Sequence, residues 1–327
     1  MKSEGKEKGT YIRVGATTRK ATPEKIQELE LYGARQTYDS IVEHAVNPAT
    51  KDEINRLCND INTYCGKTEK PVTINQLLGW QLLIKHRNQF LPTNAFRILT
   101  GNGIHFSRIQ CAVFSGIDKV NFLDRKEFSG SAYELLEQAQ VFLQQHLNKA
   151  ARIVGLRRED IYEIPIAALR ELIANAILHR NYLVHGFIQI SIFDNRVEIL
   201  SPGALYANLT REEMLNGHSR QRNPILAEIF QRMGIVEKWG TGIRRVQELC
   251  QAAGLNHPDF DVSEDAVRVT LFRKNSNLNT KELSLSIREQ AISGYISTHP
   301  DVTVRELATI FNISKSTAAR IAKKLRG

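Results

Sequence analysis

The chain has 327 residues, 42% of them hydrophobic and 24% charged, which allows two or three globular domains and excludes a disordered or collagen-like chain. Lys and Arg number 44 against 35 Asp and Glu, giving a net charge of +9. Residues 1–22 and 275–327 each carry +4, so only the two ends show the clustered basic charge that indicates nucleic-acid binding.

The first 130 residues predict a hairpin and then a mixed region. Residues 1–22 hold a Gly- and Lys-rich turn and the β-rich run YIRV. One hairpin cannot form a core, so this one either pairs with a later sheet or closes a domain that begins earlier. In the segment 23–130 we expect helical structure over 23–62, a helix over 74–83 and a buried strand over 109–115.

The segment 131–274 alternates helices and strands. A long amphipathic helix is expected from Ser131, and a second one after Pro165. Strands are expected at 187–194, 196–200 and 267–272. The stretch 201–237 is rich in Gly and Arg and predicts loops with one short helix, and residues 275–284 form a polar linker.

Residues 285–327 predict three capped helices. Capping boxes at Ser286 and Thr303 begin the first two, and Ser314 caps the third. The third helix has a basic, hydroxylated outer face, as a helix that reads the DNA major groove requires. Its candidate DNA-binding residues are Lys315, Ser316, Thr317, Arg320, Lys323 and Lys324. The alternative is a helical bundle whose basic face is simply solvated.

A carboxylate and an amide share one face of a central helix. In ALRELIANAILHRNY, residues 168–182, Glu171 and Asn175 are four apart and lie opposite the apolar side. The carboxylate is suited to polarising a water, and the amide oxygen to binding Mg²⁺. A solvated helix face explains the same pair without any site.

Two glycine turns follow that helix. Ser201-Pro202-Gly203 is a turn at which the backbone can approach a ligand. Gly240-Thr241-Gly242 precedes a helix, where free amides and the helix dipole favour phosphate. A tight loop-to-helix turn explains the second motif equally well.

The order of these motifs resembles the N-box, first glycine box, lid and second glycine box of GHKL ATP-binding domains, with SRQRNP, residues 219–224, as the lid. The segments ALRELIANAILHRNY, VEILSPGAL, RNPILAEIF and KWGTGIRRV are similar to the divergent GHKL domain of bacterial and archaeal transcriptional regulators. In that family an AlbA/Schlafen-like domain precedes the GHKL domain, and a winged helix often follows. The opening KSEGKEKGTYIRVGATTRKAT resembles the last hairpin of the AlbA-like domain.

The resemblance implies an α+β protein with a GHKL-like α/β sandwich and a winged-helix-like, all-α helix-turn-helix domain. The implied segments are 1–22, the hairpin remnant of an AlbA-like domain; 23–130, a connecting region; 131–274, the ATP-binding domain; 275–284, a linker; and 285–327, the DNA-binding domain. Carried over by position, Glu171 is the water-activating base and Asn175 the Mg²⁺ ligand. The implied nucleotide-binding residues are Asn175, Ser201, Gly203, Arg222, Gly240, Thr241 and Gly242, with ATP and Mg²⁺ as cofactors.

Two departures from the family pattern favour nucleotide binding over turnover. Ser201 stands where active GHKL proteins carry the Asp that reads adenine, and Leu205 replaces the second glycine of that box. A hydroxyl accepts a hydrogen bond but selects less strongly than a carboxylate. Asn181 also replaces the usual Asp of the family's His-Arg-Asp-Tyr.

Three functions therefore stay open at the level of sequence. The first is a DNA-binding transcriptional regulator, a homodimer on double-stranded DNA whose GHKL-like domain binds ATP and mediates dimerisation, because two half-sites multiply affinity. The second is a slow Mg²⁺-dependent ATPase. The third is a nucleotide-free scaffold for protein partners.

Other chemistries find no motif in the sequence. It contains no P-loop, no Gly-x-Ser-x-Gly elbow and no His-Glu-x-x-His, and His179 and His185 lack ligand spacing. Four cysteines form no Cys-x-x-Cys pair, so neither a zinc knuckle nor a disulfide framework is indicated. The polar start and short apolar runs predict a cytoplasmic protein with no membrane segment.

Overall fold

The computed structural model describes residues 5, 9–14, 17–43, 47–65, 71–102, 108–154, 157–237, 242–273, 292, 295 and 302–311. Contacts divide the chain into two compact units, residues 1–274 and 275–327. Within the described residues, no helix combines the length and the apolar character needed to cross a membrane.

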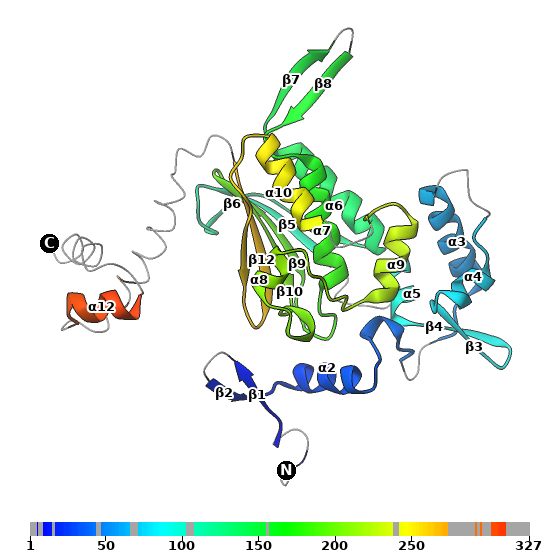
Figure 1. Cartoon of the computed structure of the whole chain (residues 1–327). Coiled ribbons are helices and arrows are strands. Elements are labelled where there is room, and N and C mark those ends of the chain that lie inside the picture. The colour runs from blue at the N-terminus through cyan, green and yellow to red at the C-terminus, as the bar shows by residue number, and fades with distance from the viewer. Residues whose placement is uncertain are drawn as a thin grey trace. The chain divides into compact units, whose positions relative to one another are not determined.

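A mixed six-stranded sheet forms the centre of the first unit (Figure 1). Its strands are β5 (Arg108–Ser115), β6 (Asn121–Ser129), β9 (Ile188–Ile192), β10 (Arg196–Pro202), β11 (Asp259–Val262) and β12 (Ala266–Phe272). They lie in the order β11-β12-β10-β9-β5-β6. The β5–β9 pair is parallel and the other neighbouring pairs are antiparallel. The α+β class and the four strands expected from the sequence are confirmed.

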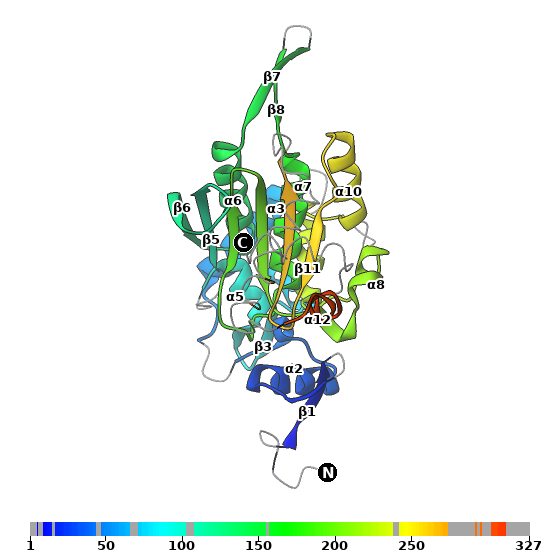
Figure 2. The ribbon, with the colours of Figure 1, turned by 90° about the vertical axis from the view of Figure 1, so that its left-hand side faces the viewer.

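One face of this sheet carries a row of buried apolar side chains. Ile190 pairs with Cys111 on one side and with Ile199 on the other, and Ile199 pairs in turn with Val269. All four are buried. Two helices, α6 (Ala132–His146) and α7 (Ile166–His179), lie side by side against the sheet (Figures 1 and 2). The alternation of strand residues therefore fixes which face the helices cover.

Local sequence signals set the starts of both helices. Ser131 Oγ accepts a hydrogen bond from the Glu134 backbone N at 3.3 Å. The Glu134 carboxylate in turn accepts one from the Ser131 backbone N at 3.0 Å, which completes a capping box on α6. Pro165 precedes the first residue of α7. The expected helix over 168–182 ends earlier, at His179, because Asn223 Nδ2 donates to the carbonyls of Leu178 and Arg180.

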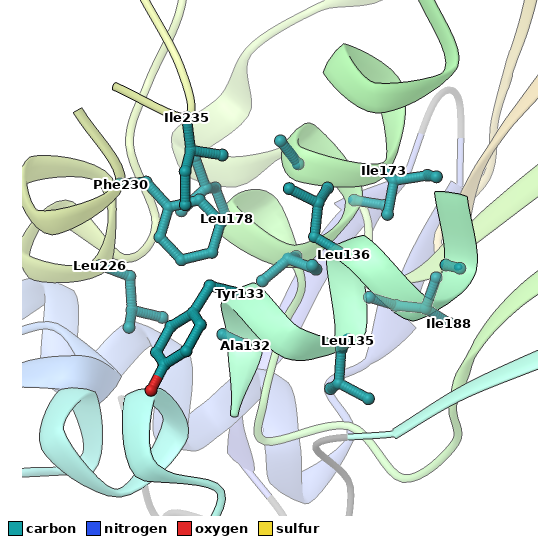
Figure 3. Close-up of a cluster of buried hydrophobic side chains, with 14 of the residues drawn as sticks. Ala132, Tyr133, Leu135, Leu136, Ile173, Leu178, Ile188, Leu226, Phe230 and Ile235 are labelled. Carbon is teal, nitrogen blue, oxygen red and sulfur yellow. The ribbon is translucent and has the colours of Figure 1, made fainter. Parts of the chain in front are cut away.

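The helices bury a shared core with α9 (Pro224–Arg232). Figure 3 shows Tyr133 of α6 beside Leu226 and Phe230 of α9, with Leu178 of α7 next to Phe230. Full burial of such side chains contributes roughly 1.5–3 kcal/mol each. The core therefore ties α9 to the two helices on the sheet.

The edge strand β6 was not expected from the sequence. It carries the charged run Asp124–Glu127 and is exposed along nearly its whole length, and the pairing register shifts between Val113 and Phe114 of β5. Charges and an irregular register are typical of sheet edges, where they oppose pairing with another chain. They also remove the alternating pattern that identifies a strand.

The boundary expected at residue 131 is not a boundary of the fold. Strands β5 and β6 precede it, yet β5 pairs directly with β9 and shares its hydrophobic core. The segments 23–130 and 131–274 thus contribute to one sheet.

The N-terminal part of the unit contains short elements. They are β1 (Tyr11–Val14), β2 (Thr17–Lys20), α2 (Pro23–Gly33), the 3₁₀ helix η1 (Tyr38–Ser40), α3 (Lys51–Cys65), α4 (Ile74–Gly79), β3 (Leu83–His86), β4 (Gln89–Pro92) and α5 (Asn94–Thr100). The hairpin β1–β2 pairs only with itself among the described strands. The helix expected over 74–83 stops at Gly79, because Leu83 enters a hairpin in which it pairs with Pro92.

The remaining elements of the first unit are a two-stranded hairpin, a 3₁₀ helix and two further α-helices. They are β7 (Lys149–Val154), β8 (Arg157–Tyr162), the 3₁₀ helix η2 (Tyr206–Asn208), α8 (Arg211–Leu215) and α10 (Gly242–Ala252). The stretch 201–237 thus holds η2, α8 and α9, more than the one short helix expected there.

The described part of the second unit is centred on α12 (Val304–Ile310). Thr303 and Glu306 form the capping box expected at its start. Ile292, Val302 and Leu307 form a small buried cluster. The third predicted helix, with all six candidate DNA-binding residues, lies outside the described residues.

Candidate functional site

A cavity of about 420 Å³ opens on the helical side of the sheet, within the size range of small-molecule sites. It is lined by parts of α7, β10, η2, α9, α10 and β12, and by the loop that precedes α9. Its lining mixes apolar residues such as Leu172 and Ile199 with several charged and polar groups. Five residues expected from the sequence to form a site line it: Glu171, Asn175, Ser201, Gly203 and Gly242.

Glu171 and Asn175 meet in this cavity as the helical spacing predicts. Asn175 Nδ2 donates to Glu171 Oε1 at 3.3 Å, which leaves the Asn175 Oδ1 as a potential metal ligand. Burial raises the pKa of Glu171, while the hydrogen bond from Asn175 and the nearby charge of Arg245 oppose the rise. A carboxyl with a raised pKa is a better proton acceptor once ionised.

Gly242, the first residue of α10, lies against Glu171. A Cβ at this position would come within 2.0 Å of Glu171 Oε1 and 3.4 Å of Asn175 Nδ2. A larger residue at position 242 would have to displace the Glu171 carboxylate from its place beside the N-terminus of α10. Gly240 and Thr241, the other residues of this motif, lie outside the described residues.

Ser201 and Gly203 at the end of β10 form another part of the cavity lining. The Ser201 Oγ donates to the Ala176 carbonyl at 2.8 Å, so its remaining lone pairs can only accept. Gly203 has a φ of 103°, and a Cβ there would lie 2.4 Å from the Asn181 Cβ. The close approach of this turn to Asn181, in the segment that follows α7, requires glycine.

The expected role of Arg222 in nucleotide binding is corrected by the structure. Its side chain does not line the cavity and is nearly fully buried. It pairs with Glu28 of α2 at 3.0 Å and donates to the carbonyls of His179 and Ala204, each at 2.8 Å. With its donors engaged in this way, Arg222 supports the wall of the cavity from behind.

Several residues that line the cavity were not identified from the sequence. Arg245 of α10 forms an ion pair with Glu237, and both lie in the lining, as does Arg220 of the expected lid loop. Val267 and Val269 of β12 add an apolar surface. The spacing of Gly242 and Arg245, three residues along one helix, was the one signal that could have indicated the arginine. Among the described residues, no group of three or more His, Cys, Asp or Glu side chains is arranged to hold a metal ion.

His179 also lines the cavity, and its environment gives a prediction about acid stability. Burial, with a smaller effect of Arg222, lowers the pKa of His179 from 6.5 to about 4. Above pH 6.5 the His179 side chain is neutral in both the folded and the unfolded protein, and its contribution to stability is fully present. As the pH falls toward 4, the unfolded chain binds the proton first, so the free energy of unfolding decreases, by up to about 3 kcal/mol.

Urea unfolding of the wild type and His179→Gln at pH 7 and pH 5 measures this effect. We expect the wild type to lose more stability between the two pH values than the variant. An equal loss in both proteins would show that another group causes the acid sensitivity.

The comparisons with known proteins agree with part of this picture. Residues 185–271 match a family model described as "Putative ATP-dependent DNA helicase recG C-terminal". The match supports an ATPase-like domain. It includes Ser201, Gly203 and the GTG motif, and it begins after Glu171 and Asn175. No curated protein matches the chain.

A similar solved structure is that of the DIP2311 protein from Corynebacterium diphtheriae. The TM-score is 0.59 at 21% identity, over 96% of this chain and 65% of that chain. The chain thus spans less than two thirds of the protein that it matches. Identity this low supports a shared fold and carries no information on activity.

Proposed function

We propose that the cavity binds a Mg²⁺–adenine nucleotide and that this chain is a nucleotide-responsive DNA-binding regulator. One observation carries the nucleotide part: Glu171, Asn175, Ser201, Gly203 and Gly242, separated by as many as 71 residues, line one cavity. The match of residues 185–271 to an ATPase-like family supports it.

The chemistry of the donor groups fits this ligand. Asn175 Oδ1 would bind Mg²⁺, which keeps most of its own waters and needs few protein ligands. The first turn of α10, which begins at Gly242 in the cavity lining, would hold phosphate oxygens through its backbone N–H groups. The accepting Ser201 Oγ suits the amino group of adenine better than the carbonyl of guanine. The bound Mg²⁺ would neutralise part of the negative charge of the phosphates.

Thermal unfolding with and without Mg-ATP tests the nucleotide part. At about 100 times the dissociation constant, binding stabilises the folded state by about 2.7 kcal/mol, which raises the melting temperature by several degrees. We expect Asn175→Ala to remove this rise, and Asn59→Ala, an exposed asparagine on α3, to retain it. No rise at millimolar nucleotide in the wild type would favour a nucleotide-free scaffold.

Release of phosphate distinguishes a regulator from a slow ATPase. Turnover that Glu171→Gln abolishes would assign Glu171 as a base, whereas binding without turnover supports a nucleotide sensor. The DNA-binding part of the proposal rests on the capped, basic C-terminal segment, and it includes a homodimer, because two half-sites multiply a weak single contact.

A further inference from the structure

Helix α2 places a buried carboxylate behind the cavity, although α2 itself does not line it. Glu28 is 9% exposed and accepts from Nε and Nη2 of Arg222 at 3.2 and 3.0 Å. Lys25 of the same helix also donates to Glu28, at 2.6 Å. Arg222 lies 194 residues away in the sequence, so this is a long-range contact between the N-terminal segment and the loop before α9.

Arg222 transmits this contact to two parts of the cavity wall. It donates to the carbonyl oxygens of His179 and Ala204, and both residues line the cavity. Its guanidinium also lies 5.2 Å from the ring centroid of Tyr206, another lining residue. Tyr32 of α2 contacts the same ring edge-on, with the two ring centroids 6.3 Å apart. Removing the charge of Glu28 would leave a buried cation unpaired in the middle of this arrangement.

A second contact joins the same N-terminal segment to α9. Asp39 of η1 is fully buried, and its Oδ2 accepts from the backbone N of Ile225 at 2.8 Å and of Leu226 at 3.1 Å. These N–H groups belong to the first turn of α9, where the helix itself provides no acceptor for them. Helix α9 contributes Pro224 and Ala227 to the cavity lining. Residues 23–40 thus hold two walls of the cavity through two separate polar contacts.

We propose that residues 23–40 regulate the cavity: Glu28 and Asp39 are positioning residues, and occupancy of the cavity is coupled to the order of this segment. The inference rests on the proposed function for the identity of the ligand. Coupling of this kind is reciprocal, so a nucleotide that orders the wall also orders α2, and a partner or preceding domain that displaces α2 weakens nucleotide binding. The regulating input would therefore arrive through the N-terminal segment.

Hydrogen exchange measured on the full chain tests the inference with two variants. Glu28→Gln removes the buried charge, and Glu30→Gln makes the same change on the exposed side of α2. Without ligand, we expect Glu28→Gln to accelerate exchange in residues 203–209 and at the end of α7, with Glu30→Gln like the wild type. With Mg-ADP, we expect slower exchange in residues 23–33 of the wild type. We expect the dissociation constant for Mg-ADP to be about fivefold higher in Glu28→Gln than in the wild type.

The outcomes separate this inference from the proposed function. If Mg-ADP slows exchange in α7 and α9 but leaves residues 23–33 and the affinity of Glu28→Gln unchanged, the coupling is overturned and the nucleotide site stands. If Mg-ADP changes exchange nowhere, the nucleotide site fails, and the ligand-free comparison still decides whether Glu28 positions the wall. Equal exchange in Glu28→Gln and Glu30→Gln overturns that role. Asp39→Asn provides a second test should Glu28→Gln fail to fold.

Discussion

Replacing Asp39 with alanine is expected to lower the free energy of unfolding by about 2 to 4 kcal/mol. The carboxylate has no exposed surface and accepts from two backbone N–H groups at the start of α9 and from Thr37 Oγ1 at 2.5 Å. Without it, the two backbone N–H groups remain buried with no acceptor, at the start of a helix that carries Leu226 and Phe230 into the core. Urea unfolding followed by circular dichroism measures the loss.

The matched control is Asp52→Ala, which also removes an acidic residue from the N-terminal turn of a helix. Asp52 is exposed, so we expect a change of only a few tenths of a kcal/mol. Asp39→Asn, which retains an acceptor oxygen, should fall between the two. If Asp39→Ala were no more harmful than Asp52→Ala, the contact between η1 and α9 would contribute nothing to stability.

Asp39 illustrates why local signals predicted some elements and missed others. The helix from Ser131 and the strand over 109–115 were predictable, because a capping box and an apolar run are written in adjacent residues. The cap of α9 was not predictable. Asn223, at the N-cap position, donates its side-chain amide to the end of α7. The backbone N–H of Ile225 instead donates to Asp39 of η1, which lies 186 residues earlier in the sequence. No periodicity in the sequence reports such a partner.

The same reasoning separates the parts of the site. Glu171 and Asn175 could be predicted to meet, because residues four apart share a helix face. Arg222 could not be assigned, because its position in a lid-like loop does not reveal the carboxylate of Glu28 that binds it. A basic residue in a lid-like loop predicts a ligand contact, whereas in the structure Arg222 is buried and supports the cavity wall. Long-range polar contacts therefore decide which residues reach the cavity.

The DNA-binding part of the proposal makes the last prediction, which concerns residues of the third predicted helix. Combining Lys315→Glu with Arg320→Glu removes two cations from its outer face and adds two anions. If both contact phosphates, affinity for duplex DNA at about 0.1 M salt should fall by about 100-fold or more, and the slope of log affinity against log salt should fall by about 2. Fluorescence anisotropy with a labelled duplex over a salt series measures both quantities.

The control for this prediction changes the net charge by the same amount outside the reading helix. Lys281→Glu with Arg288→Glu alters the linker and the first predicted helix. We expect a smaller loss there, due to long-range repulsion alone, which salt screens over about 8–10 Å. An equal loss in both double variants would assign the binding to net charge rather than to this helix. Unchanged affinity in Lys315→Glu with Arg320→Glu would remove the third helix from the DNA interface and leave the nucleotide cavity as the functional centre of the chain.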